Sequence, residues 1–467
     1  MDKELKRMIR VFVSICILFI GLIVYLTYFQ VFTASSIKNN SYNKRLWIDE
    51  ENIKRGMILD RNGKILAYSE KEGDSMKRHY NYGRLYSHVI GYSFREYGKA
   101  GLESSYNNEL LNLSENTPLN EIKKIVKPNS EGNTLKLTID HGLQQYASDL
   151  LEGKKGAIVL MNPQTGEIYA MVSKPDFNTN KLKEDWKSIV EDPDSPFLNR
   201  ATMGLYAPGS TFKVVTSVAA LESSNIDYTI DCEGSVNING YTLKDYNGKP
   251  HGKLNLEEAL VKSCNVYFSQ LGLQVGKDKL GEVSEKFMIN KKIPFDLPTK
   301  KSTFPFNSVM EKTEIAASSI GQGKILVTPL NMAMIASAIA NRGVMVEPVL
   351  VKEVISPEGE IVKSNDTKEL SRATDTFTAN EVKNMMVEVV QRGTGKNARI
   401  NNVRVAGKTG TAENPTGKAH SWFIGFVPAE DPKLAISVVL ESEGSTGGVG
   451  AAPIAKQLMA EAINKIH

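Results

Sequence analysis

One apolar run near the N-terminus constrains the fold of this chain more than any other feature. From Val11 to Phe29 the sequence reads VFVSICILFIGLIVYLTYF, and the next charged residue is Lys38. A helix rises about 1.5 Å per residue, so a run of this length spans a bilayer core of about 30 Å. Residues 11–32 are therefore predicted to be a transmembrane anchor in contact with membrane lipid.

Basic residues before the anchor predict its orientation. Lys3, Lys6, Arg7 and Arg10 precede it, and the positive-inside rule then places residues 1–10 in the cytoplasm. The rest of the chain is expected outside the plasma membrane, which would make this a single-pass protein. A cleaved signal peptide is the alternative, but the apolar core of a signal peptide spans only about 7–15 residues.

The composition argues against several kinds of partner and site. The 467 residues carry a net charge of only +4, which gives no reason to expect a nucleic-acid partner. The three cysteines, Cys16, Cys232 and Cys264, show no C-x-x-C spacing, and the six histidines form no H-E-x-x-H motif. These spacings predict neither a disulfide framework nor a metal or redox site.

Polar, turn-rich sequence over residues 33–140 predicts a small β-rich module after the anchor. Its strongest local signal is Asn62-Gly63, which lies between the strand-like segments 56–61 and 64–69. Asn and Gly both tolerate the positive φ angles of a type I′ turn, so a two-residue hairpin is expected there. The module has no cluster of residues that suggests catalysis.

Residues 141–467 read as a larger mixed domain. Helical patterns dominate from Ser210 to Asn341 and return at 452–466. Strand patterns lie before and after that stretch, at 156–161, 167–172, 349–355, 421–427 and 434–440. This order predicts an α+β fold in which helices flank an antiparallel sheet and form an inserted helical lobe.

The first candidate for catalysis is APGSTFK, from Ala207 to Lys213. Pro208 and Gly209 interrupt the chain before Ser210, and a buried apolar helix is predicted to start near that serine. Residues i and i+3 share a helix face, so Lys213 can reach the Ser210 hydroxyl and activate it as a base. A lysine can do so if burial and a second cation lower its pKa.

This motif also has ordinary explanations. Ser41 and Lys44 show the same S-x-x-K spacing in a polar region without a buried helix. Ser210 could simply cap a helix N-terminus, and Lys213 could extend its apolar stem along the surface. The first motif alone leaves catalysis open.

The second candidate is Ser263-Cys264-Asn265, at a break between two apolar helical stretches. A loop there would present Ser263 to relay a proton and Asn265 to orient a substrate carbonyl. The S-x-N pattern is common, since residues 105–107 and 223–225 also have it. A helix-cap loop without catalytic function is the alternative.

The third candidate is Lys408-Thr409-Gly410-Thr411, after a strand-like stretch. On an edge strand this segment would offer a cation for a carboxylate, a hydroxyl, and backbone N–H groups beside a residue without a side chain. A phosphate-binding loop is excluded, because G-x-x-x-x-G-K-T needs glycine where the chain has Asn402. The absence of G-x-S-x-G argues against an α/β-hydrolase.

In this order, the three motifs are those of β-lactamases and penicillin-binding proteins. The chain resembles the class B penicillin-binding proteins, the monofunctional peptidoglycan D,D-transpeptidases of bacteria. The resemblance covers nearly the whole length and includes RGMILDRNGKILA at 55–67 and SIGQGKILVTPLNMAMIASAIANRG at 319–343. It implies a fold like that of the serine β-lactamases for residues 141–467, with a reduced pedestal over 33–140.

The resemblance implies a role for each residue of the first two motifs. Ser210 would be acylated by the D-Ala-D-Ala end of a peptidoglycan stem peptide, with Lys213 as the base. Ser263 and Asn265 would relay the proton and hold the substrate. A second stem peptide would then take the acyl group, and no metal or organic cofactor would be needed.

The third motif would bind the substrate. Lys408 and Thr409 would hold the carboxylate of the stem peptide or of a β-lactam inhibitor. The backbone N–H groups of Ser210 and Thr411, beside Gly410, would form the oxyanion hole. Because the resemblance includes no glycan-polymerising domain, it also implies a partner, a membrane polymerase of the SEDS type, during division, elongation or sporulation.

Two alternative functions use the same motifs. A β-lactamase would hydrolyse its acyl-enzyme, and class A enzymes carry Glu-x-x-Leu-Asn after the second motif. Here the only similar run, at 109–112, precedes Ser210. A β-lactam sensor would need a cytoplasmic signalling domain, and a scaffold would have no reason to keep all three motifs.

Overall fold

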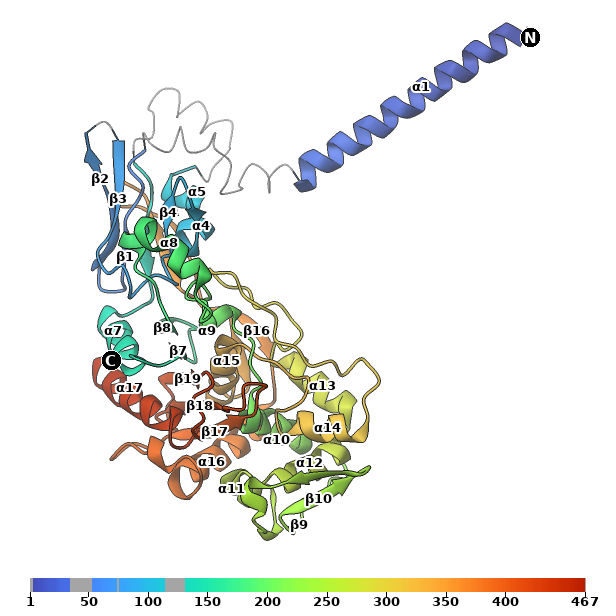
Figure 1. Cartoon of the computed structure of the whole chain (residues 1–467), viewed down its shortest axis with the longest axis vertical. Coiled ribbons are helices and arrows are strands. Elements are labelled where there is room, and N and C mark those ends of the chain that lie inside the picture. The colour runs from blue at the N-terminus through green and yellow to red at the C-terminus, as the bar shows by residue number, and fades with distance from the viewer. Residues whose placement is uncertain (1–2, 34–52, 74, 114–130, 467) are drawn as a thin grey trace.

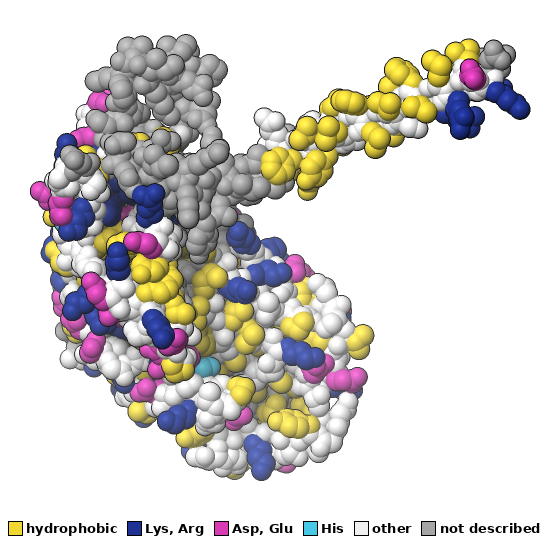
Figure 2. Space-filling view, turned by 45° about the horizontal axis from the view of Figure 1, so that its top comes forward, with side chains coloured by type: hydrophobic (Ala, Val, Ile, Leu, Met, Phe, Trp, Pro, Cys, Tyr) yellow, Lys and Arg dark blue, Asp and Glu magenta, His cyan; other side chains and the backbone are white. Residues whose placement is uncertain are grey.

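The computed structural model describes residues 3–33, 53–73, 75–113 and 131–466 (Figure 1). Helix α1 (Lys3–Tyr28) has 26 residues, is long and apolar enough to cross a membrane, and runs into the π-helical turn η1 (Phe29–Thr33). Figure 2 shows apolar side chains along most of α1 and basic side chains near its start. The predicted apolar helix is present, and its orientation in a membrane stays a prediction.

A five-stranded antiparallel sheet forms the centre of the larger domain. Its strand order is β17 (Ala406–Ala412), β18 (His420–Val427), β19 (Leu434–Leu440), β7 (Gly156–Met161) and β8 (Ile168–Lys174). Each neighbouring pair is antiparallel, and β17 lies at one edge. The α+β fold predicted from early and late strands is confirmed.

Helices cover both faces of this sheet because its strands are apolar on both sides. Val159 of β7 belongs to the core that includes α15 (Pro329–Ala340), whereas its neighbour Leu160 belongs to the core that includes α17 (Ala451–Lys465). Successive residues of a strand point to opposite faces, which explains this division. α7 (His141–Leu150) packs in the second core.

The chain between β8 and β17 supplies the inserted helical lobe. Its main helices are α10 (Lys213–Leu221), α11 (Leu256–Lys262), α12 (Asn265–Val275), α13 (Lys277–Lys286), α14 (Lys312–Ser319) and α16 (Thr376–Arg392). Two small antiparallel pairs join β9 (Ile230–Cys232) to β12 (Gly252–Leu254) and β10 (Ser235–Ile238) to β11 (Tyr241–Lys244). The edge strand β17 contacts α16 and the turn before α10, so this edge meets the lobe.

A second, six-stranded sheet forms the pedestal. Its order is β15 (Ile361–Ser364), β14 (Val351–Ile355), β6 (Thr134–Leu137), β1 (Ile58–Leu59), β2 (Ile65–Glu72) and β3 (Ser75–Tyr80). Most of the strand predicted at 349–355 therefore pairs with the N-terminal module, and only Val349 forms a bridge beside the central sheet, to Glu167. Because this sheet takes strands from both sides of residue 140, the domain boundary expected there stays a prediction.

The remaining described strands and α-helices are short elements around the two sheets. They are β4 (Ser93–Phe94), β5 (Gly98–Lys99), α4 (Gly101–Ser105), α5 (Asn107–Leu110), α8 (Leu182–Glu191), α9 (Arg200–Met203), β13 (Val344–Val346) and β16 (Glu369–Arg372). β13 pairs with β16, and α8 and α9 connect β8 to the first motif.

The hairpin expected at Asn62-Gly63 is present, but its turn differs from the prediction. β1 and β2 pair antiparallel, and only Gly63 of the two turn residues has a positive φ, of 85°. The turn is therefore not type I′. The Asp60 carboxylate accepts the N–H groups of Asn62 at 2.9 Å and Lys64 at 2.7 Å, which stabilises a longer connection.

Candidate active site

Ser210 lies in a tight turn against the edge of the central sheet. The 3₁₀ turn η3 (Gly209–Phe212) leads directly into α10, and Pro208, not Ser210, occupies the N-cap position. Gly209 has a φ of 54°, and a Cβ at this position would lie 2.6 Å from the Thr411 carbonyl oxygen. Only glycine allows this approach, so the Pro-Gly break brings Ser210 next to the third motif.

Lys213 is fully buried at the start of α10, one turn after Ser210. Its Nζ donates to the Ser263 carbonyl oxygen at 2.6 Å and to Asn265 Oδ1 at 2.8 Å. Burial lowers the pKa of Lys213 to about 8, although the nearby Asp245 and Cys264 act in the opposite direction. A substantial neutral fraction is therefore accessible near neutral pH, as a general base requires.

The second motif forms the predicted break between two helices. α11 ends at Lys262, Ser263 adopts a left-handed conformation with a φ of 57°, and Cys264 caps α12. A positive φ is unfavourable for a serine, so the surrounding contacts must hold this loop. The backbone N–H of Asn265 donates to Asp245 Oδ1 at 3.0 Å, and its side-chain amide donates to the Lys244 carbonyl oxygen at 3.3 Å.

Lys408 reaches the second motif from the edge strand β17. Its Nζ donates to Ser263 Oγ at 2.8 Å and to the Thr409 carbonyl oxygen at 3.0 Å. Lys213 Nζ lies 3.5 Å from the same Ser263 hydroxyl, so two lysines converge on it. Burial, and next the charge of Lys213, hold the pKa of Lys408 well below its usual value.

The rest of the third motif lines the approach to Ser210. Thr409 Oγ1 lies 2.7 Å from Thr394 Oγ1, which follows α16. A Cβ on Gly410 would lie 2.8 Å from the Pro208 carbonyl oxygen, so glycine lets β17 approach the turn that carries Ser210. Together with Thr411, these residues give the edge strand a polar surface beside the turn.

The structure brings all three motifs together. Lys213, Ser263, Asn265 and Lys408 form one hydrogen-bonded network, and the turn η3, which carries Ser210, packs against β17 with Gly209 beside Thr411. The hydrogen bonds of Lys213 go to Ser263 and Asn265 of the second motif, and none goes to Ser210. Catalytic hydrogen bonds often tighten only when substrate is bound. The competing Ser41/Lys44 pair lies outside the described residues.

Several residues that shape this site gave no sequence signal. Asp245 and Thr394 each contact a motif residue distant in the sequence. The indole of Trp422 donates to the Ala207 carbonyl oxygen at 3.0 Å and fixes the segment that leads to Ser210. None of the three belongs to a recognisable local pattern, and only the tertiary structure identifies them.

Comparison with known proteins agrees with this geometry. The family model of the penicillin binding protein transpeptidase domain matches residues 156–460, and that of the penicillin binding protein A dimerisation domain matches residues 55–135. Peptidoglycan D,D-transpeptidase PbpA of Mycolicibacterium smegmatis is 32% identical over 487 residues, which cover 98% of each chain.

Two solved structures share the fold over most of this chain. Penicillin-binding protein A of M. tuberculosis, as a ceftriaxone acyl-enzyme complex, gives a TM-score of 0.83 at 30% identity and covers 89% of this chain and 100% of that one. The D,D-transpeptidase domain of a peptidoglycan glycosyltransferase from Eggerthella lenta gives 0.81 at 36% identity, covering 89% and 99%.

Proposed function

This chain belongs to the penicillin-binding protein transpeptidase family, and from that membership we propose that Ser210 is the nucleophile of a peptidoglycan D,D-transpeptidase. The predicted resemblance to class B penicillin-binding proteins is confirmed, and the β-lactamase alternative is the weaker one. The observation that carries the proposal is the meeting of the three motifs at one sheet edge, with Lys213 and Lys408 both directed at Ser263.

Acylation begins when Ser210 Oγ attacks the carbonyl carbon between the two D-Ala residues of a stem peptide. The neutral amine of Lys213 accepts the hydroxyl proton as the new C–O bond forms. The backbone N–H groups of Ser210 and Thr411 stabilise the oxyanion, and the turn-to-strand contact of η3 with β17 supports this pairing. The product of this half-reaction is a Ser210 ester.

The second motif moves the proton to the leaving group. Ser263 lies between both lysines, so its hydroxyl can take a proton from Lys213 and deliver one to the departing D-Ala nitrogen. As the C–N bond breaks, D-Ala leaves as a free amine. Asn265, held by Asp245, orients the substrate through its side-chain amide.

The third motif recognises the free carboxylate of the donor peptide. A protonated Lys408 supplies the positive charge and Thr409 a hydroxyl, with Gly410 leaving room along the strand. An amine of a second stem peptide then attacks the Ser210 ester, which forms the cross-link and returns the serine. A β-lactam presents the same carboxylate and a reactive amide, so it acylates the same serine.

The helix α1 supports a proposed placement of the enzyme at the membrane. This helix anchors the chain in the plasma membrane, with residues 1–10 in the cytoplasm and the three motifs outside, where wall precursors are cross-linked. The glycan strands come from a separate polymerase of the SEDS type. The apolar run of α1 that follows Arg10 supports the anchor, and the basic residues at the start of the helix support the orientation.

A covalent labelling experiment tests the nucleophile. The full-length protein in detergent, treated with fluorescent penicillin, is expected to gain one adduct on the peptide that contains Ser210 and to keep it for minutes or longer. Ser210→Ala should remove the adduct without changing the melting temperature. Ser41→Ala, in the competing S-x-x-K sequence, is the matched control and should label normally.

Three other outcomes would contradict the proposal. A labelled Ser210→Ala protein would place the nucleophile elsewhere. Rapid release of hydrolysed penicillin would favour a β-lactamase, and a folded protein without any adduct would favour a scaffold.

A further inference from the structure

Thr394 lies where the helix that ends at the second motif meets the third motif. It follows α16, which lies beside both α11 and β17 (Figure 1). The Thr394 Oγ1 atom lies 2.7 Å from Thr409 Oγ1 on β17. Its backbone N–H donates to the carbonyl oxygen of Val261 at 3.3 Å, in α11 and two residues before Ser263. One residue therefore contacts the supports of two motifs.

The main chain around Thr394 is closely packed. Gly448, in the loop after β19, lies directly on the Thr394 carbonyl group, and a Cβ there would be 2.6 Å from the oxygen. The Asn397 side-chain amide donates to the Gly448 carbonyl oxygen at 2.7 Å. The N–H of the adjacent Gly447 donates to Thr411 Oγ1 at 3.2 Å. These contacts hold the Thr394 hydroxyl in a fixed place relative to the third motif.

The hydroxyls of Thr394 and Thr409 can share a proton in two arrangements, since either oxygen can be the donor. If Thr409 donates, its only proton is used within the pair. If Thr394 donates, the Thr409 proton is free for a ligand. A carboxylate accepts hydrogen bonds and donates none, so an anionic ligand selects the second arrangement.

The hydroxyl of Thr409 depends on Thr394 for its orientation. Thr409 is only 5% exposed. Within the part of the chain that the structure describes, Thr394 is the only hydrogen-bond partner of this hydroxyl. A hydroxyl that accepts one hydrogen bond also donates the next one more strongly, because such chains are cooperative.

We propose that Thr394 is a positioning residue for the carboxylate site of the third motif. Its hydroxyl donates to Thr409 Oγ1 and so directs the Thr409 proton to the free carboxylate of the donor peptide or of a β-lactam. Thr394 thereby increases the preference of the site for ligands that carry this negative charge. The inference rests on the proposed role of Thr409 in binding the carboxylate.

Two ligands that differ in charge at one group test this role. The full-length protein in detergent is treated with benzylpenicillin or with its methyl ester, which lacks the carboxylate charge, and the acylation rate of Ser210 is measured. Thr394→Val keeps the shape of the side chain and removes its hydroxyl. It is expected to slow acylation by the acid about threefold to tenfold, the effect of one neutral hydrogen bond, and acylation by the ester less than about twofold.

Two further variants separate the hydroxyl from the packing of the residue. Thr394→Ser keeps the hydroxyl and should restore most of the rate with the acid. Thr374→Val is the matched control, because Thr374 precedes α16 and its hydroxyl donates to Glu222, outside the three motifs. It should leave acylation by both ligands unchanged. Thermal unfolding shows whether each variant is folded.

A double-mutant cycle tests whether Thr394 acts through Thr409. If it does, adding Thr394→Val to Thr409→Val should have no further effect on acylation by benzylpenicillin. Independent effects of the two substitutions would place Thr394 in direct contact with the carboxylate and overturn the positioning role.

Three other results would refute the inference. Equal losses with the acid and the ester would show that Thr394 only supports the shape of the cleft. An unchanged rate with the acid, or a Thr394→Ser variant as slow as Thr394→Val, would show that its hydroxyl has no role. Adducts on Ser210 in these samples would leave the proposed enzymatic function intact, whereas an unmodified protein without any adduct would refute that function itself.

Discussion

Among the described residues, two pairs of buried basic side chains have opposite electrostatic surroundings. In the pedestal, Arg55 and Arg78 share the fully buried carboxylate of Glu103. Arg78 Nε lies 2.7 Å from Glu103 Oε1, and Arg55 Nε bonds the other carboxylate oxygen. Burial opposes ionisation of Glu103, but the two guanidinium groups outweigh it and lower its pKa. The one carboxylate is shared by both guanidinium groups and offsets part of their charge.

At the active site, none of the described carboxylates forms an ion pair with either of the two buried lysines. Lys213 and Lys408 both contact Ser263, and burial lowers the pKa of each. The comparison shows that one fold uses buried charges for two purposes, stability in the pedestal and reactivity at the active site. Paired charges fix a structure, whereas like charges crowded in a buried site shift pKa values into a useful range, at a cost in stability.

The largest effect should come from removing the proposed base. Lys213→Met is expected to slow acylation by penicillin about a thousandfold or more, because the Ser210 proton then has no acceptor. The free energy of unfolding should stay the same or rise, since methionine avoids the burial of an ammonium group. Stopped-flow acylation and thermal unfolding measure the two quantities. A fast variant would exclude Lys213 as the base.

A substitution in the pedestal cluster should lower stability and leave the acylation rate unchanged. Glu103→Gln leaves two buried guanidinium groups without their anion and is expected to lower the free energy of unfolding by about 3–5 kcal/mol. Acylation by the folded fraction should not change. Glu96→Gln is the matched control, because its ion pair with Lys183 is exposed and contributes about 1 kcal/mol or less. Equal effects of the two substitutions on unfolding would contradict a structural role for this cluster.

The contrast between the two buried clusters could not be predicted from the sequence, although many of the active-site residues could. Ser210, Lys213, Ser263 and Lys408 belong to three motifs, each of which alone has an ordinary explanation. The three motifs in their order along the chain made these residues predictable. That Lys213 and Lys408 converge on Ser263 depends on how β17 packs against the lobe, which no local pattern encodes.

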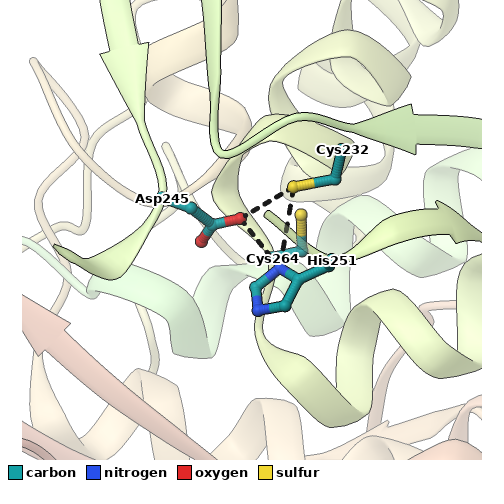
Figure 3. A group of neighbouring side chains, drawn as sticks. All are labelled: Cys232, Asp245, His251 and Cys264. Carbon is teal, nitrogen blue, oxygen red and sulfur yellow. Dashed lines mark hydrogen bonds and ion pairs between the residues drawn. The ribbon is translucent and has the colours of Figure 1, made fainter. Parts of the chain in front are cut away.

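The fold shows the same limit. Strand alternation and helical periodicity predicted the central sheet and its covering helices. The segment 349–355 was also predicted to be a strand, but its pairing with the pedestal depends on contacts between residues that are far apart in the sequence. The turn at Asn62 depends on the Asp60 carboxylate rather than on turn propensity alone. The group of Cys232, Asp245, His251 and Cys264 comes from four segments that only the folded lobe brings together (Figure 3).

The smallest effect, a change in rate with pH, follows from the lowered pKa of Lys213. A pKa of about 8 means that protonation disables the base as the pH falls, so acylation should rise with pH and level off above about pH 8. Each pH unit below that value should lower the rate about tenfold. The charged and titratable neighbours are Asp245 and Cys264, which raise this pKa, and Lys408 on β17. Lys408→Arg keeps its charge at every pH tested and so isolates the Lys213 limb. A profile that is flat or falls between about pH 6 and 8, in protein shown to be folded by circular dichroism, would refute a neutral Lys213 as the base and with it the contrast between the two clusters.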